Sequence, residues 1–128
     1  METMEAPRAT ILLVDDDAIM LCAVSMLLAR HGHKVLQACG PLEALEILRG
    51  GGPVDIVISD FRMPGLNGGE LLREIAQISP STMGIIISAG TVHTLEVPSG
   101  VPILRKPFPI GDLLAEIDRV WLALMRRR

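Results

Sequence analysis

Polar side chains that can bind a cation or a phosphate group stand at the ends of four short apolar runs in the sequence. The runs span residues 10–14, 54–59, 83–88 and 101–104, and each has the length of a strand buried on both faces. The polar residues that end or follow these runs are Asp15, Asp16, Asp17, Asp60, Ser88 and Lys106. The carboxyl ends of parallel strands meet at one edge of a sheet, where α/β proteins bind ligands. We therefore expect these side chains to converge on one site.

The chemistry of this set points to phosphoryl transfer with a divalent cation. Carboxylates that cluster without partners repel one another, and a hard cation such as Mg²⁺ removes that repulsion by binding carboxylate, water and phosphate oxygens. Lys106 supplies a point charge for a phosphate group, and Ser88 supplies a hydroxyl donor. Asp17 also has a simpler interpretation as a helix cap. Positioning and charge neutralisation account for most of the catalysis in phosphoryl transfer, which these residue types can supply.

The elements that must position these residues alternate between strands and helices. A weaker strand is expected at residues 34–38, and helices are expected at the ranges 18–30, 41–49, 68–78 and 110–125. The segment 91–100 contains Pro98, so its helix is expected to be short, irregular or missing. This alternation is typical of an α/β domain in which helices cover both faces of a parallel sheet, a three-layer α/β/α architecture.

Composition excludes several classes of protein. The chain has 128 residues, of which 49% are hydrophobic and 21% charged, as in one folded domain. A net charge of −3 and only 2% aromatic residues argue against direct binding of nucleic acid. The longest apolar stretch, residues 18–29, is much shorter than the ~20 residues that span a bilayer, so we expect a cytoplasmic protein that does not enter a membrane. Cys22 and Cys39 lack the spacing of a metal site and are expected to be buried thiols.

Four segments resemble the response-regulator receiver domain of two-component signalling. They are ILLVDDD at residues 11–17, DIVISDFRMPGLNG at 55–68, IIISA at 85–89 and LRKPF at 104–108. The resemblance covers residues 8–125, so it implies one receiver domain with short tails at 1–7 and 126–128. It also implies a flavodoxin-like sheet of five parallel strands in the order 2-1-3-4-5.

The resemblance assigns the acidic residues to phosphoryl acceptance and metal binding. It implies that Asp60 takes a phosphoryl group from a phosphohistidine on a histidine kinase or a phosphotransfer protein. Asp15 and Asp16 would hold Mg²⁺ together with Asp60 and the backbone carbonyl of Arg62. The domain would catalyse only its own phosphorylation and dephosphorylation, and is otherwise not an enzyme.

The resemblance also implies how the phosphoryl group is recognised and how the signal leaves. Ser88 would donate a hydrogen bond to the phosphoryl group after transfer. Lys106 would pair with Asp60 and then with the phosphate, and the Lys106–Pro107 peptide bond would be cis. The domain would shift between two conformations and signal to a downstream effector protein or to an output domain outside this sequence.

Two features of the sequence depart from the family pattern. Ile103 stands three positions before Lys106, where the family has an aromatic residue that moves during switching. The helix expected at residues 18–30 is apolar all round. We expect a core-facing stripe on it made of Ile19, Ala23, Met26, Leu27 and Arg30. One sheet cannot bury all of the other apolar residues of this helix, which are Met20, Leu21, Val24 and Leu28. These are then either scattered surface residues or a docking patch for the kinase partner.

Two alternative functions remain open at this stage. A haloacid-dehalogenase-type phosphatase also uses an aspartate after its first strand, and Asp15 and Asp17 have the required spacing. Such an enzyme needs an acidic pair at a later strand end, whereas Asp112 and Asp118 fall within the last expected helix. The second alternative is a receiver-like interaction module whose switching is atypical or independent of phosphorylation.

Overall fold

The chain alternates strands and helices in the computed structural model, which describes residues 8–127. The elements are β1 (Thr10–Val14), α1 (Ala18–Arg30), β2 (Lys34–Ala38), α2 (Pro41–Arg49), β3 (Ile56–Asp60), α3 (Gly68–Ile78), β4 (Met83–Ser88), the single 3-10 turn η1 (Thr94–Glu96), β5 (Ile103–Arg105) and α4 (Ile110–Arg127). Most of these bounds agree with the sequence-based expectation. The third and fifth strands begin two residues later than expected, and the last helix continues past residue 125.

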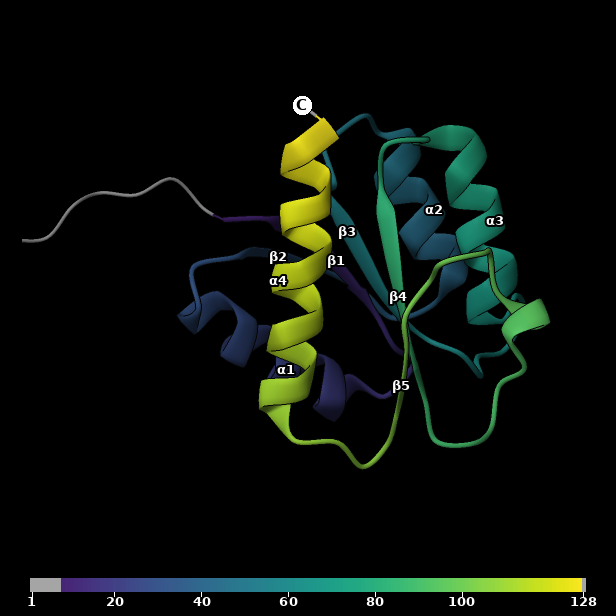
Figure 1. Ribbon diagram of the computed structural model, residues 1–128. Coiled ribbons are helices and arrows are strands. Elements are labelled where there is room, and N and C mark those ends of the chain that lie inside the picture. Colours follow the sequence, from purple (N-terminus) through teal and green to yellow (C-terminus); the bar gives the residue numbers. More distant parts are fainter. Residues whose placement is uncertain (1–7, 128) are drawn as a thin grey trace, which may run out of the picture.

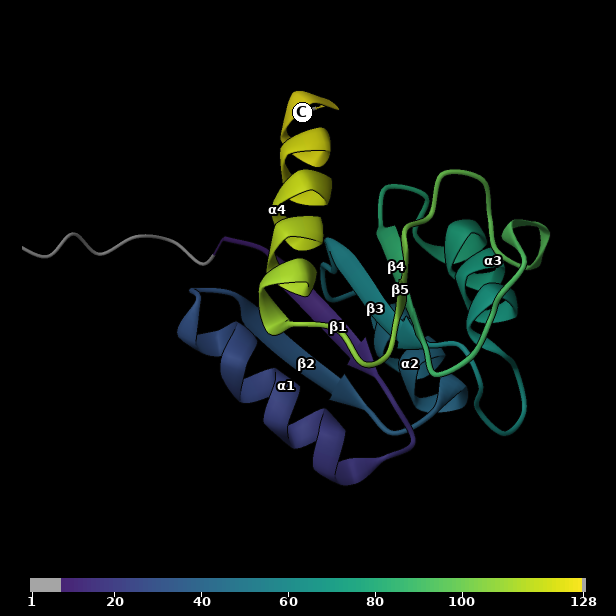
Figure 2. The ribbon, with the colours of Figure 1, turned by 60° about the horizontal axis from the view of Figure 1, so that its bottom comes forward.

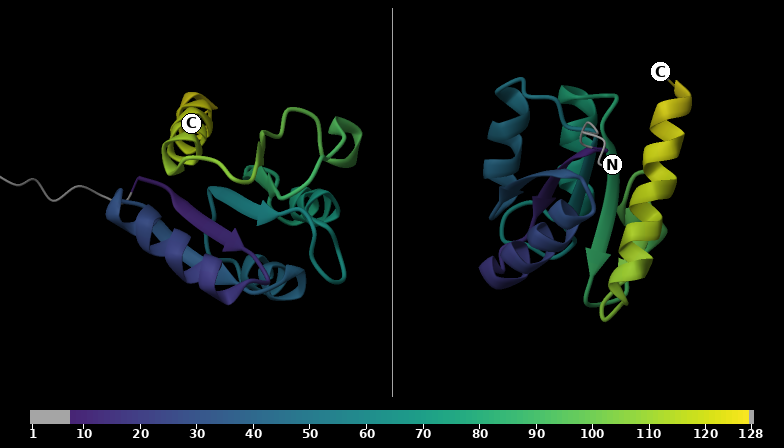
Figure 3. Two further views of the ribbon diagram at one scale, coloured as in Figure 1. Left: turned by 90° about the horizontal axis from the view of Figure 1, so that it is seen from below. Right: turned by 90° about the vertical axis from the view of Figure 1, so that its left-hand side faces the viewer.

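The five strands of residues 8–127 form one parallel sheet in the order β2-β1-β3-β4-β5, as expected (Figure 1). The central strands β1 and β3 are buried over four of their five residues, because both of their faces are covered. Leu12 and Val57 point into a core shared with α2 and α3, whereas Ile11 and Ile58 point into a core shared with α1 and α4. The sheet therefore lies between two helical layers, with α2 and α4 on opposite sides (Figure 3, right).

Side-chain caps fix where two of the helices begin. Asp17 accepts hydrogen bonds at Oδ1 from the backbone N–H groups of Ile19 (3.0 Å) and Met20 (3.3 Å), which confirms its interpretation as the N-cap of α1. Asn67 and Glu70 form a capping box at the start of α3, each bonding the backbone N–H of the other. These side chains therefore fix where the connections after β1 and β3 end.

The orientation expected for α1 was wrong. The sheet-facing residues of α1 are Leu21, Ser25 and Leu28, whereas Ile19 is 81% exposed and Met26 is 58% exposed. Leu21 and Leu28 lie two turns apart on one face of the helix, and that face packs beside β2 (Figure 2). An apolar helix offers several faces that could be buried, so the pattern of residue types does not select one.

The expected burial of the two thiols was also wrong. Cys22 lies on the outer side of α1 and Cys39 lies in the turn after β2, and both are free and exposed.

The segment between β4 and β5 forms only the single turn η1, so the expectation of a short or irregular fourth helix is confirmed. Val97 is nevertheless 4% exposed and closes the core on the α3 side of the sheet. The expected tails at residues 1–7 and at Arg128 lie outside the described residues, while Arg126 and Arg127 belong to α4. Within the described part of the chain, no helix combines the length and apolar character that a membrane span requires.

Candidate functional site

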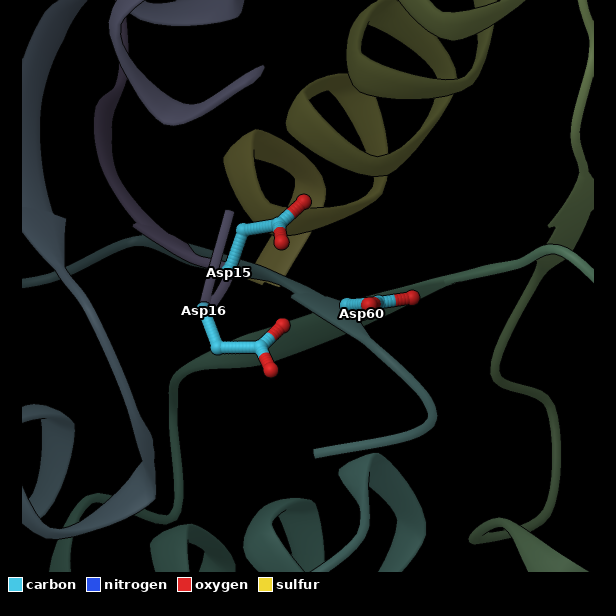
Figure 4. Close-up of side chains that lie close together, drawn as sticks. All are labelled: Asp15, Asp16 and Asp60. Atoms are coloured by element: carbon cyan, nitrogen blue, oxygen red, sulfur yellow. The ribbon is translucent and has the colours of Figure 1, made fainter. Parts of the chain in front are cut away.

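Three carboxylates converge at the carboxyl edge of the sheet. Asp15 and Asp16 follow β1 directly, and Asp60 ends the neighbouring strand β3. One carboxylate oxygen from each lies within 4.8 Å of the other two, and Figure 4 shows the Asp15 and Asp16 side chains extending toward the side on which Asp60 lies. The two strands are adjacent in the sheet, so residues that are far apart in the sequence meet here, as the sequence predicted.

Lys106 supplies a cation to the same space from the end of β5. Its Nζ lies 3.9 Å from Oδ2 of Asp15 and 3.9 Å from Oδ1 of Asp60. The backbone N–H of Lys106 donates to the carbonyl oxygen of Ser88 at 2.7 Å, and the Lys106–Pro107 bond is cis, as expected. One ammonium facing three carboxylates leaves the site with an excess of negative charge, which favours a bound cation.

The acceptor candidate Asp60 is partly shielded from water. Burial raises the pKa of its carboxyl, and the neighbouring carboxylates of Asp15 and Asp16 act in the same direction. Lys106 and the backbone N–H of Phe61 oppose that shift. The Asp60 side chain nevertheless keeps 15% of its surface exposed, so its carboxylate remains in contact with solvent.

The backbone orients Asp15 in a way that the sequence analysis missed. The N–H of Asp17 donates to Oδ1 of Asp15 at 2.9 Å, while Oδ2 of Asp15 faces Lys106. An aspartate that accepts from the N–H two residues later forms an Asx turn, so the run of three acids contained a signal for this contact. Asp15 therefore has one oxygen held by the backbone and the other directed into the site.

Ser88 lies beside the carboxylates but is bonded elsewhere. It is fully buried at the end of β4, next to β3. Its hydroxyl donates to the carbonyl oxygen of Gly90 at 2.9 Å and accepts from the N–H of Gly90 at 3.1 Å. A hydrogen bond to a phosphoryl group thus requires this hydroxyl to leave the Gly90 carbonyl.

The Arg62 side chain lies over the Phe61 ring and close to Gly90. Its guanidinium carbon lies 5.8 Å from the centre of the Phe61 ring, and a Cβ at Gly90 would lie 3.8 Å from its Nε. The Arg62 side chain therefore spans the gap between the loop after β3 and the loop after β4. The expected role of its backbone carbonyl as a metal ligand stays a prediction.

Comparison with known proteins agrees with this geometry. The family model "Response regulator receiver domain" matches residues 11–118, and the chain belongs to that family. The sensor kinase CckA of Brucella abortus is 37% identical over 118 residues, which are 88% of this chain and 12% of the kinase. The receiver protein CpdR of the same organism is 30% identical over 117 residues, which are 88% of this chain and 97% of CpdR.

The fold has a close match among solved structures. A response regulator receiver domain from Clostridium thermocellum superimposes with a TM-score of 0.83 at 31% identity, covering 94% of this chain and 99% of that one. The chain spans only 12–24% of the length of the first curated relatives that it matches. This protein therefore contains a receiver domain of two-component signalling with the flavodoxin-like fold.

Family membership leaves the phosphatase alternative without support. Asp112 and Asp118 both lie within α4 and not at a strand end, as the sequence analysis expected. Receiver domains are not classical enzymes.

Proposed function

We propose that Asp60 is the phosphoacceptor of this receiver domain and that Asp15, Asp16, Ser88 and Lys106 serve the transfer. The observation that carries this proposal is the convergence of three carboxylates and one ammonium around an Asp60 side chain that remains partly exposed. Charge neutralisation and positioning are the main demands of phosphoryl transfer, and these residues meet both.

An oxygen of the Asp60 carboxylate attacks the phosphorus of a phosphohistidine on the partner. The O–P bond forms as the P–N bond breaks, and the imidazole leaves with the electron pair of that bond. Lys106 starts 3.9 Å from the attacking side chain, so its ammonium can follow the charge from the carboxylate to the phosphoryl oxygens. Ser88 then turns its hydroxyl from the Gly90 carbonyl to a phosphoryl oxygen.

The carboxylate cluster fits Mg²⁺, because hard oxygen ligands predominate and their charge is not balanced by Lys106 alone. Asp15, Asp16, Asp60 and the carbonyl of Arg62 are the groups that would hold it. When bound, the cation offsets the negative charge that carboxylates and phosphate bring together.

The phosphoryl donor is a histidine kinase or a phosphotransfer protein, docked beside Lys106. A groove of about 400 Å³ opens there between α1 and the start of α4, lined mainly by apolar residues that include Met20, Val24, Leu27 and Phe108. Its apolar lining suits a helical surface on the partner. The recipient of the signal is a downstream effector protein or an output domain in the same polypeptide, and we propose a cytoplasmic location without direct contact to nucleic acid or membrane.

Incubation with Mg²⁺ and acetyl phosphate tests this function directly. Intact-mass spectrometry should show one added phosphoryl group on the wild-type domain and none on Asp60→Asn. The Asp17→Asn variant is the matched control, because Asp17 caps α1 and stands outside the carboxylate cluster. Failure of the wild-type domain to gain mass or to bind beryllofluoride would favour the phosphorylation-independent interaction module.

A further inference from the structure

The connection from β4 to β5 is fastened onto α3. We call residues 91–100 of this connection the strap; it lies beside α3 (Figure 1). Arg73 on α3 donates from Nη1 to the carbonyl oxygen of Glu96 at 3.3 Å and from Nη2 to that of Leu95 at 3.2 Å. One guanidinium thus holds two consecutive carbonyls of the single turn η1.

A second contact lies one helical turn earlier on the same face of α3. A Cβ at Gly69 would collide with the carbonyl oxygen of Glu96, so the strap approaches α3 more closely than any larger residue allows. Positions 69 and 73 are neighbours on the helix surface. Gly69 and Arg73 therefore form one docking surface for the strap.

The strap and α3, which form the two sides of this contact, both begin near the phosphoryl site. The strap is joined to β4 through Gly90, whose backbone pairs with the hydroxyl of Ser88. Helix α3 begins at Gly68, whose N–H donates at 2.7 Å to the carbonyl oxygen of Phe61, the residue after Asp60. A shift of Ser88 therefore acts on the strap, and a shift of Asp60 acts on α3.

The hydroxyl of Ser88 has one proton and cannot give it to two acceptors. If it donates to a phosphoryl oxygen, the carbonyl of Gly90 loses its partner, and the start of the strap is released. Gly90 is separated from η1 by only three residues, Thr91, Val92 and His93. This segment is too short to absorb a movement of Gly90 without moving η1. Ile103 lies against the same core as Val97 and carries no ring that could swing.

We propose that Arg73 latches the strap onto α3 in the unphosphorylated conformation of this receiver domain. The inference rests on the proposed phosphorylation of Asp60. A latch that stabilises one conformation opposes every ligand that prefers the other, so weakening the latch raises affinity at the phosphoryl site.

The test measures binding of beryllofluoride with MgCl₂ to the wild-type domain, Arg73→Gln and Arg49→Gln. Arg49 is the matched control, because it is an exposed arginine in the last turn of another helix. We expect Arg73→Gln to bind beryllofluoride at least about fivefold more tightly and Arg49→Gln to bind like the wild type. Hydrogen exchange should show that beryllofluoride loosens the amides of Glu96 and Val97 in the wild-type domain, and that they are already loose in Arg73→Gln.

The outcomes separate this inference from the function on which it rests. An Arg73→Gln variant with a loosened strap but unchanged affinity overturns the latch and leaves phosphorylation of Asp60 intact. Absence of beryllofluoride binding by the wild-type domain defeats both. If Arg73→Gln does not fold, exchange on the wild-type domain decides, since unchanged protection of Glu96 and Val97 on adding beryllofluoride overturns the proposal.

Discussion

The ammonium of Lys106 lies 3.9 Å from Oδ1 of Asp60, which is too long for a hydrogen bond but short enough for strong attraction. The same ammonium lies 3.9 Å from Asp15, so it is shared between two carboxylates and tightly bonded to neither. A lysine held in this way can move with the negative charge when a phosphoryl group arrives. One ammonium cannot balance the negative charge of all three carboxylates in the cluster.

Neutralising the acceptor should stabilise the domain in the absence of metal. Burial and the carboxylates of Asp15 and Asp16 raise the pKa of Asp60, so its charged form is disfavoured in the folded state. This destabilisation is present at neutral pH and fades as the pH falls through the pKa of the folded state. In EDTA, thermal unfolding of Asp60→Asn should occur about 2–5 °C above that of the wild type. Glu74→Gln, at an exposed site on α3, is the control that should show little change.

In the presence of divalent metal, the wild-type domain should become more stable than Asp60→Asn. If the three carboxylates bind Mg²⁺, a free Mg²⁺ concentration of ten times the dissociation constant stabilises the wild-type domain by about 1.4 kcal/mol. Asp16→Asn should lose most of this increment, because it removes one of the three clustered carboxylates. Thermal unfolding at several MgCl₂ concentrations measures the effect. Equal stabilisation of the wild type and Asp16→Asn would place the metal elsewhere.

Two faces of α1 should differ in their effect on phosphotransfer. Met20 and Val24 line the groove beside Lys106, whereas Ile19 and Met26 project from an exposed face that is not part of the groove lining. The double substitution Met20→Ala and Val24→Ala should slow transfer from a phosphohistidine partner about tenfold, since truncating interface anchors commonly removes ~1–2 kcal/mol.

Transfer from acetyl phosphate should be unchanged in that double variant, because a small donor needs no docking surface. The matched control is the double variant Ile19→Ala and Met26→Ala, which should transfer at the wild-type rate. If the control is slowed and the groove variant is not, the partner docks on the outer face of α1.

Acid should weaken the fold through His33. Nδ1 of this buried ring accepts the backbone N–H of Ala9 at 3.2 Å and must therefore be unprotonated. Burial lowers the pKa of His33, with Arg8 and His31 acting in the same direction and Asp118 against them. Since the unfolded chain binds this proton near pH 6.5, stability should be complete above that pH and should fall below it, by at most about 1.4 kcal/mol per pH unit.

Urea unfolding between about pH 7.5 and about pH 5.5 measures that slope. His33→Gln should flatten it, while His31→Gln, at an exposed position, should not. A slope that survives His33→Gln would assign it to other groups.

Gly68 should tolerate no side chain. A Cβ there would lie 2.7 Å from the carbonyl oxygen of Asp60 and 2.8 Å from Cδ1 of Ile86. Gly68→Ala should therefore destabilise the domain by about 1–3 kcal/mol in urea unfolding and reduce phosphorylation by acetyl phosphate. Gly111→Ala is the comparison, since a Cβ at Gly111 meets nothing within 4 Å and should leave both properties unchanged or slightly improved.

Much of the fold and the site could be predicted from the order of residue types. Short apolar runs ending in Asp15, Asp60, Ser88 and Lys106 indicated parallel strands, and parallel strands bring their carboxyl ends to one edge. The cap at Asp17 and the single turn between β4 and β5 also follow from local sequence, because caps and helix breakers act over a few residues.

Only the tertiary structure decided how the elements face one another. Helix α1 is apolar on every side, so its own sequence could not indicate that Leu21 and Leu28 face the sheet while Ile19 and Cys22 face solvent. The hydrogen bonds from Arg73 to the carbonyls of Leu95 and Glu96 join residues about twenty positions apart. They form only because the sheet brings α3 and the strap together. Local sequence specifies which elements form, whereas contacts between elements depend on the packing of the whole chain.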